Sequence, residues 1–133
     1  LSCGAIGGWE YLALHTDEVL AGAVLIAGSG AEALAFAGCD LGKVPIWAFH
    51  GSADATVDAT MGTIDPMHEL KTCTDPKPVD ARVTVYPGVG HWFAEADRHD
   101  AYDAAAAARA LRRTVSFLRD RLQTSAVAPP EEW

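Results

Sequence analysis

The sequence predicts an α/β fold in which a parallel sheet is flanked by helices. Three observations lead to this prediction. Short continuous apolar runs, each closed by a glycine-containing turn, are typical of strands that are buried on both faces. Between these runs, apolar residues recur at three- and four-residue spacing, as they do in amphipathic helices. The two kinds of segment alternate along the chain, as a parallel sheet requires.

The first half of the chain predicts two helices and two strands. A helix is expected at 5–15 after a glycine-rich turn, because apolar residues share one face there: Ile6, Trp9, Leu12 and Ala13. A buried strand follows at 21–27 (AGAVLIA), and a short helix is predicted at 31–37. The second buried strand is predicted at 44–50 (VPIWAFH) and ends at a glycine.

The second half predicts two more helices around a third strand. Thr63 or Asp65 is expected to cap a helix that runs to about Thr72. The third strand is predicted at 81–86 (ARVTVY), where the sequence PGVG ends it. The longest helix is predicted at 101–123, with leucine and valine along one stripe and most of its arginines on a solvated face.

Length and composition limit the classes of protein to consider. The 133 residues suit one domain, predicted at 1–123, followed by a flexible tail at 124–133. Half of the residues are hydrophobic, which predicts a soluble globular protein, and no apolar run approaches the roughly 18 residues of a membrane span. A net charge of -8 repels phosphate backbones and anionic lipid, so neither nucleic-acid nor membrane partners are expected. The compartment and the oligomeric state stay open, with the cytoplasm favoured over secretion.

Three chemically useful side chains stand where a parallel sheet gathers its ligands, beyond the carboxyl ends of the strands. Ser2 lies just before the first helix, Asp54 follows the second strand, and His91 follows the third. A hydroxyl, a carboxylate and an imidazole in this chain order suit nucleophilic catalysis, because serine needs an imidazole to take its proton and the imidazole needs a carboxylate to orient it.

Over nearly the whole chain, to about Gln123, the sequence resembles the α/β-hydrolases. Within them it is similar to the dienelactone hydrolase and carboxylesterase-like branch, which includes related predicted peptidases. The resemblance depends on four segments: LSCGAIGGWEYLALH, VPIWAFHGSADATV, VYPGVGHWF and YDAAAAARALRRTVSFL. It implies the C-terminal part of such a domain, with about three strands present and the N-terminal strands missing.

The resemblance implies hydrolysis of small-molecule carboxylic esters, or of amides, through an acyl-enzyme. Ser2 would be the nucleophile, His91 the general base and acid, and Asp54 the group that orients the imidazole. The backbone N–H of Cys3 would be one oxyanion donor, and Gly4 would let the chain turn sharply at the nucleophile. No cofactor is implied. The histidines and carboxylates show no metal-ligand spacing, so no metal is predicted.

Several alternatives stay open at these positions. Ser2 is also a good helix cap, Cys3 could replace it as a thiol nucleophile of the dienelactone hydrolase type, and Asp58 competes for the role of the acid. Trp92 and Phe93 either line an acyl pocket or belong to the core.

Two further questions concern cysteines and the class of function. Cys39 and Cys73 precede adjacent strands and form either a disulfide or two free thiols. His50 ends a buried strand and is expected to be a packed, hydrogen-bonded residue. The second class of function is a non-catalytic fragment, or a binding module that keeps the fold but not the activity, because the N-terminal strands and the loop with the second oxyanion donor are expected to be missing from this chain. For the same reason the isolated chain is expected to be poorly active or inactive.

Overall fold

The computed structural model describes residues 1–17, 22–75 and 79–124. Its strands are β1 (Ala23–Ile26), β2 (Ile46–Gly51) and β3 (Ala81–Tyr86), and they form a parallel sheet in the order β1-β2-β3. The α-helices are α1 (Ser2–Leu14), α2 (Ala31–Ala37), α3 (Asp65–Thr72) and α4 (Ala104–Thr124). A 3₁₀ turn, η1 (Gly38–Lys43), follows α2, and a π-helical turn, η2 (Thr60–Ile64), leads into α3. The predicted α/β fold is confirmed.

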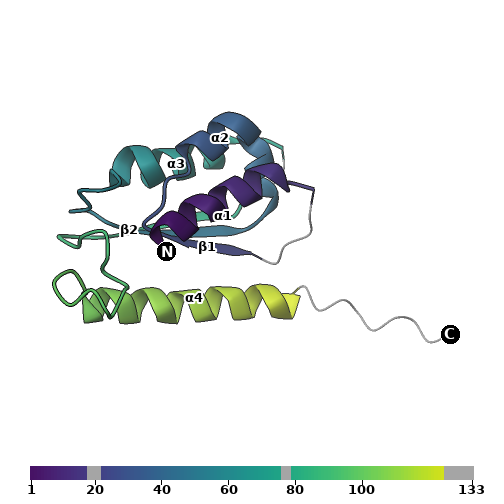
Figure 1. The fold of residues 1–133 in the computed structure, drawn as a ribbon. Coiled ribbons are helices and arrows are strands. Elements are labelled where there is room, and N and C mark those ends of the chain that lie inside the picture. The colour runs from purple at the N-terminus through teal and green to yellow at the C-terminus, as the bar shows by residue number, and fades with distance from the viewer. Residues whose placement is uncertain (18–21, 76–78, 125–133) are drawn as a thin grey trace.

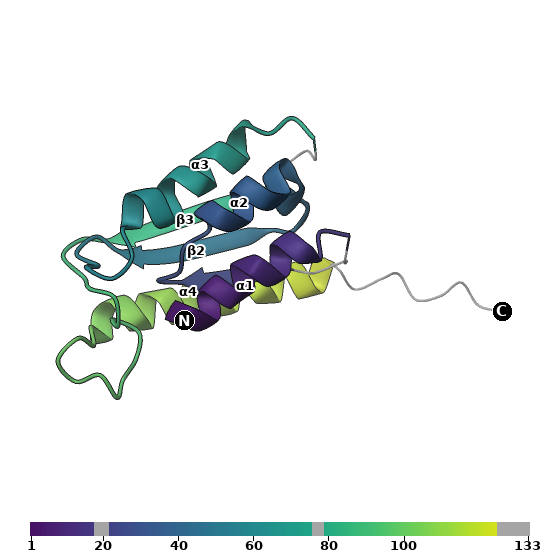
Figure 2. The ribbon, with the colours of Figure 1, turned by 45° about the horizontal axis from the view of Figure 1, so that its top comes forward.

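Helices cover both faces of the sheet. Figure 1 shows α1, α2 and α3 on one face and α4 on the other, and the turned view of Figure 2 agrees. One apolar core lies under α1, α2 and α3, and its largest buried side chains are Trp9, Leu41, Ile46, Met67 and Leu70. The second core lies toward α4 and contains Phe49, Tyr86, Phe93, Ala106 and Ala110.

Side chains of the central strand β2 point alternately into these two cores. Ile46 and Ala48 belong to the core under α1, α2 and α3, whereas Trp47 and Phe49 pack in the core toward α4. Successive side chains of a strand point to opposite faces, so His50 returns to the face of the first core. Strand β2 pairs with β1 as far as Phe49, and its last residues, His50 and Gly51, pair with β3 alone.

Helix α4 is held to the sheet by aromatic and charged side chains together. The buried Phe117 ring meets the Trp47 ring edge to face at 5.7 Å between centroids. The guanidinium of Arg82 lies over both rings, and that of Arg121 lies over Phe117. Asp80 accepts hydrogen bonds from both arginines. Arg121 is therefore part of the packing, although most arginines of this helix were expected on a solvated face.

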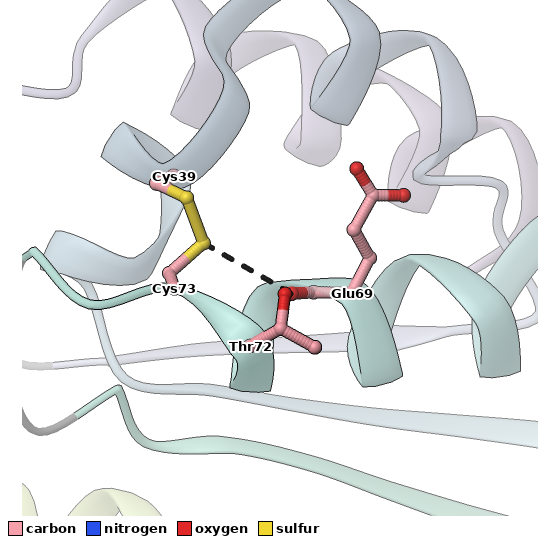
Figure 3. Close-up of a disulfide and its surroundings, with 4 residues drawn as sticks. All are labelled: Cys39, Glu69, Thr72 and Cys73. Carbon is pink, nitrogen blue, oxygen red and sulfur yellow. Dashed lines mark hydrogen bonds between the residues drawn. A yellow bond between two sulfur atoms is a disulfide. The ribbon is translucent and has the colours of Figure 1, made fainter.

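A disulfide joins Cys39 in η1 to Cys73 at the end of α3, with their Cα atoms 5.7 Å apart. Figure 3 shows it beside the last turn of α3, where the Thr72 hydroxyl donates a hydrogen bond to the Glu69 carbonyl. The question that the sequence left open is thereby decided in favour of the disulfide. Both cysteines precede strands, so the disulfide lies at the amino end of the sheet.

Some predicted boundaries and one predicted cap differ from the structure. Helix α1 begins at Ser2 rather than at residue 5, and α4 begins at Ala104. Neither Thr63 nor Asp65 caps a helix; Asp58 accepts the hydrogen bond from the Met61 amide at the start of the π-helical turn instead. Of the predicted tail, residues 125–133 lie outside the described part of the chain. Within the described ranges, no helix combines the length and the apolarity that crossing a membrane demands.

Candidate active site

The structure brings together the three side chains that the sequence singled out. Ser2 Oγ lies 2.6 Å from His91 Nε2, and His91 Nδ1 lies 2.6 Å from Asp54 Oδ2. Ser2 is the first residue of α1, Asp54 lies in the turn after β2, and His91 lies in the turn after β3. Only 8% of Ser2 and 8% of His91 are exposed, and the Asp54 side chain is fully buried.

The backbone at Ser2 turns the hydroxyl toward the imidazole. Ser2 has φ of +47°, a left-handed conformation that costs an L-residue about 1–2 kcal/mol. Leu1 is the N-cap of α1, and no side chain caps this helix, so Ser2 does not act as a helix cap. The expectation that Gly4 allows the sharp turn is wrong: its φ is not left-handed, and a Cβ there would meet nothing within 4 Å.

Asp54 has a hydrogen bond on every side of its carboxylate. Oδ1 accepts from the backbone N–H groups of Thr56 and Val57, each at 2.8 Å. Oδ2 faces His91 Nδ1 and also His50 Nε2, which lies 2.9 Å away. Burial by itself raises the pKa of this carboxyl. The Val57 amide, the His91 ring and the Thr56 amide outweigh burial and hold the pKa below its usual value.

The turns that follow β2 and β3 are joined to each other by backbone contacts. The Ala53 amide donates to the Val89 carbonyl at 2.9 Å, and the Gly88 amide donates to the Ser52 hydroxyl at 2.8 Å. Gly51 must be glycine here, because a Cβ at this position would lie 2.1 Å from the Val89 oxygen. These contacts fix the His91 loop against the Asp54 loop.

The other residues that the sequence offered for the site lie outside the line of hydrogen bonds from Ser2 to Asp54. Asp58 is exposed and caps the η2 turn. Cys3 is an exposed free thiol, and its backbone N–H belongs to the first turn of α1, where amides have no partner within the helix. Phe93 is fully buried in the core toward α4, so of its two predicted places, an acyl pocket or the core, it takes the core. Trp92 meets the His91 ring edge to face at 4.5 Å, and Arg98 lies over the indole.

Sequence reasoning missed the roles of His50 and Thr63. His50 was expected to be packed and hydrogen-bonded, as it is, but its contact with Asp54 was not foreseen. Thr63 was expected as a cap, whereas its hydroxyl lies 2.8 Å from His50 Nδ1. The signal that could have identified the contact is the four-residue separation of His50 and Asp54 across the end of a strand.

A model of the dienelactone hydrolase family matches residues 5–122. Among solved structures, Arabidopsis thaliana SOBER1 is 22% identical with a TM-score of 0.62, and the match covers 92% of this chain and 50% of that one. A putative dienelactone hydrolase from Klebsiella pneumoniae subsp. pneumoniae is 21% identical with a TM-score of 0.60, covering 86% and 48%. No curated protein gives a significant match. The structural likenesses show a shared fold, and the chain spans about half the length of these structures.

Proposed function

Because the chain belongs to the dienelactone hydrolase family, we propose that it supplies the catalytic residues of a serine hydrolase that cleaves carboxylic esters of small molecules. The observation that carries the proposal is the continuous line of hydrogen bonds from Ser2 Oγ through His91 to Asp54. Geometry of this kind activates a hydroxyl that is otherwise too weak an acid to react at neutral pH.

The proposed reaction follows from the direction of each hydrogen bond between Ser2, His91 and Asp54. At rest, the Ser2 hydroxyl donates to His91 Nε2, and His91 Nδ1–H donates to Asp54. When Oγ bonds to the ester carbonyl carbon, its proton passes to Nε2 and the carbonyl oxygen becomes an oxyanion. The bond to the alcohol then breaks, and the alcohol leaves with the proton from Nε2. Water, deprotonated by the same nitrogen, cleaves the acyl-serine ester and restores the hydroxyl.

Two further features support this mechanism. The lowered pKa of Asp54 keeps it ionised at neutral pH, so a negative charge stabilises the imidazolium that forms during the attack. The N-terminus of α1, with the Cys3 amide next to the nucleophile, offers N–H groups to the oxyanion. We propose Cys3 N–H as one oxyanion donor and Trp92, beside His91, as a wall of the substrate pocket.

The decisive experiment compares Ser2→Ala with Cys3→Ala in a full-length protein that contains this chain, using hydrolysis of p-nitrophenyl acetate. Ser2→Ala is expected to lower kcat/KM at least about a thousandfold, because the nucleophile is lost. Cys3→Ala keeps the backbone N–H and is expected to retain most of the activity. The reverse result would assign the reaction to the Cys3 thiol, which is the alternative of the dienelactone hydrolase type.

A fluorophosphonate probe separates a hydrolase from a non-catalytic protein with the same fold. Labelling is expected on Ser2 in the wild type, shown by the mass of the modified peptide, and is expected to vanish in His91→Ala. Absence of labelling in the wild type, together with absence of ester hydrolysis, would favour the non-catalytic alternative. Parallel assays with amide substrates define whether the activity extends beyond esters.

A further inference from the structure

His50 is fully buried at the end of β2, and its protonation can be read from its partners. Its Nε2 lies 2.9 Å from Asp54 Oδ2 and 3.0 Å from the Val57 carbonyl oxygen. A carboxylate and a carbonyl can only accept hydrogen bonds. Nε2 must therefore carry the hydrogen, and it donates toward Asp54.

The contacts of the other nitrogen, Nδ1, are compatible with a hydrogen on Nε2 whether the His50 ring is neutral or charged. Nδ1 lies 2.8 Å from Thr63 Oγ1, and the same hydroxyl lies 3.0 Å from the Gly28 carbonyl. If the Thr63 hydrogen points to Gly28, His50 is an imidazolium that donates from both nitrogens. If the Thr63 hydrogen points to Nδ1 instead, His50 is neutral and carries its hydrogen on Nε2. Both arrangements keep an N–H directed at Asp54 Oδ2.

Two imidazoles consequently meet on a single oxygen of Asp54. Oδ2 faces Nδ1 of His91 at 2.6 Å and Nε2 of His50 at 2.9 Å. With two amides on Oδ1, all four acceptor positions of the carboxylate are used, so it cannot rotate without losing several charge-assisted bonds. Val57 closes the arrangement by giving its N–H to Asp54 and its carbonyl to His50.

The far side of His50 is tied to the framework that carries the nucleophile. Thr63 is buried in η2, and Gly28 follows β1. Gly28 lies so close to α1 that a Cβ on it would be 2.7 Å from Ala5 Cβ. The contacts thus run from the helix of Ser2 through Gly28, Thr63 and His50 to Asp54.

We propose that His50 is a positioning residue of the active site: it holds Asp54 Oδ2 in the place from which it orients His91. The proposal rests on the proposed function, because the group that His50 orients is the acid of that reaction. It assigns to His50 no contact with substrate and no proton transfer in the cycle.

The kinetic experiment compares His50→Leu with His50→Gln in a full-length protein that contains this chain. The Gln side-chain amide can still donate toward Asp54, whereas Leu cannot. His50→Leu is expected to lower kcat for p-nitrophenyl acetate about 10- to 100-fold, the range for a lost hydrogen bond to a charged group, with little change in KM. His50→Gln is expected to recover most of kcat. Equal kcat in both variants and the wild type would overturn the proposal.

A double-mutant cycle with Asp54→Ala separates positioning from a general structural role. If His50 acts through Asp54, adding His50→Leu to Asp54→Ala is expected to cause no further loss of kcat/KM. Multiplied losses would contradict the proposal, because they would mean that His50 acts independently of the carboxylate.

Histidine side-chain NMR provides a measurement that needs no activity. In the wild type, ¹⁵N spectra are expected to show hydrogen on His50 Nε2 and on His91 Nδ1. The His91 Nδ1–H resonance is expected to move in His50→Leu and to be largely restored in His50→Gln. A wild-type His50 without hydrogen on Nε2 would overturn the proposal even if the Leu variant does not fold. Loss of Ser2-dependent hydrolysis with these resonances intact would instead contradict only the proposed function.

Discussion

The carboxylate of Asp54 has four hydrogen-bond contacts, and this environment predicts that the stability of the protein depends on pH. Its pKa in the folded protein lies below its usual value, so the folded state binds a proton less readily than the unfolded state does. The stability that this difference contributes is complete above the usual Asp pKa of about 3.9 and is lost as the pH falls through the folded pKa.

We therefore expect acid to destabilise the wild type more steeply than Asp54→Asn, in which this titration is absent. Urea denaturation at a series of pH values from neutral to strongly acidic measures the free energy of unfolding of both proteins. Asparagine keeps the shape of the side chain and one acceptor oxygen, which makes it the matched variant. Parallel pH profiles for the two proteins would contradict the prediction.

At the scale of residues, the sequence predicted the candidate site through position rather than through local pattern. Asp54 and His91 were predicted because the carboxyl ends of parallel strands meet at one edge of the sheet, and Ser2 was predicted from its position just before the first helix. The contact between His50 and Asp54 was not predicted, because it depends on a turn whose backbone wraps the carboxylate. The left-handed backbone of Ser2 was also hidden, since nothing in the residue type of serine indicates it.

Among the elements, α4 is attached to the sheet in large part by the ring of Phe117. Phe117 is 2% exposed and packs against Trp47 between two guanidinium groups. Phe117→Ala is expected to lower the free energy of unfolding by about 3–5 kcal/mol, because it removes a buried ring and leaves a cavity. Chemical denaturation followed by far-UV circular dichroism measures the loss.

Leu122→Ala provides the control for this prediction. Leu122 lies on the same helix but is 63% exposed, so its truncation is expected to change the free energy of unfolding by no more than about 0.5 kcal/mol. Similar losses in Phe117→Ala and Leu122→Ala would mean that the ring is not what attaches α4 to the sheet.

Element types were easier to predict than element boundaries. The third strand was predicted at 81–86, as observed, because a polar turn and a glycine-rich turn flank it. The first strand is shorter than predicted, since only Ala23–Ile26 pairs with β2. The start of the helix near residue 60 was missed because a π-helical turn has a different repeat from the α-helix.

For the molecule as a whole, the disulfide is expected to contribute strongly to stability. Cys39 and Cys73 are 34 positions apart, and closing a loop of that size restricts the unfolded chain by about 4 kcal/mol in the chain-entropy account. The double variant Cys39→Ala/Cys73→Ala is expected to lose stability of this order in urea denaturation, whereas Cys3→Ala is expected to lose little.

Thiol titration checks the same prediction without mutation. Denatured protein is expected to give one free thiol without reductant, from Cys3, and three after reduction. Three free thiols in protein purified under oxidising conditions would contradict the bonded state.

The disulfide and the candidate catalytic side chains occupy opposite ends of the strands: the disulfide lies at the amino end, and the candidate side chains lie at the carboxyl end. Substitutions at Trp92, the proposed pocket wall, therefore leave the disulfide untouched. Under the proposed function, the pocket wall at the carboxyl end can be varied to alter substrate selectivity while the disulfide at the amino end is retained.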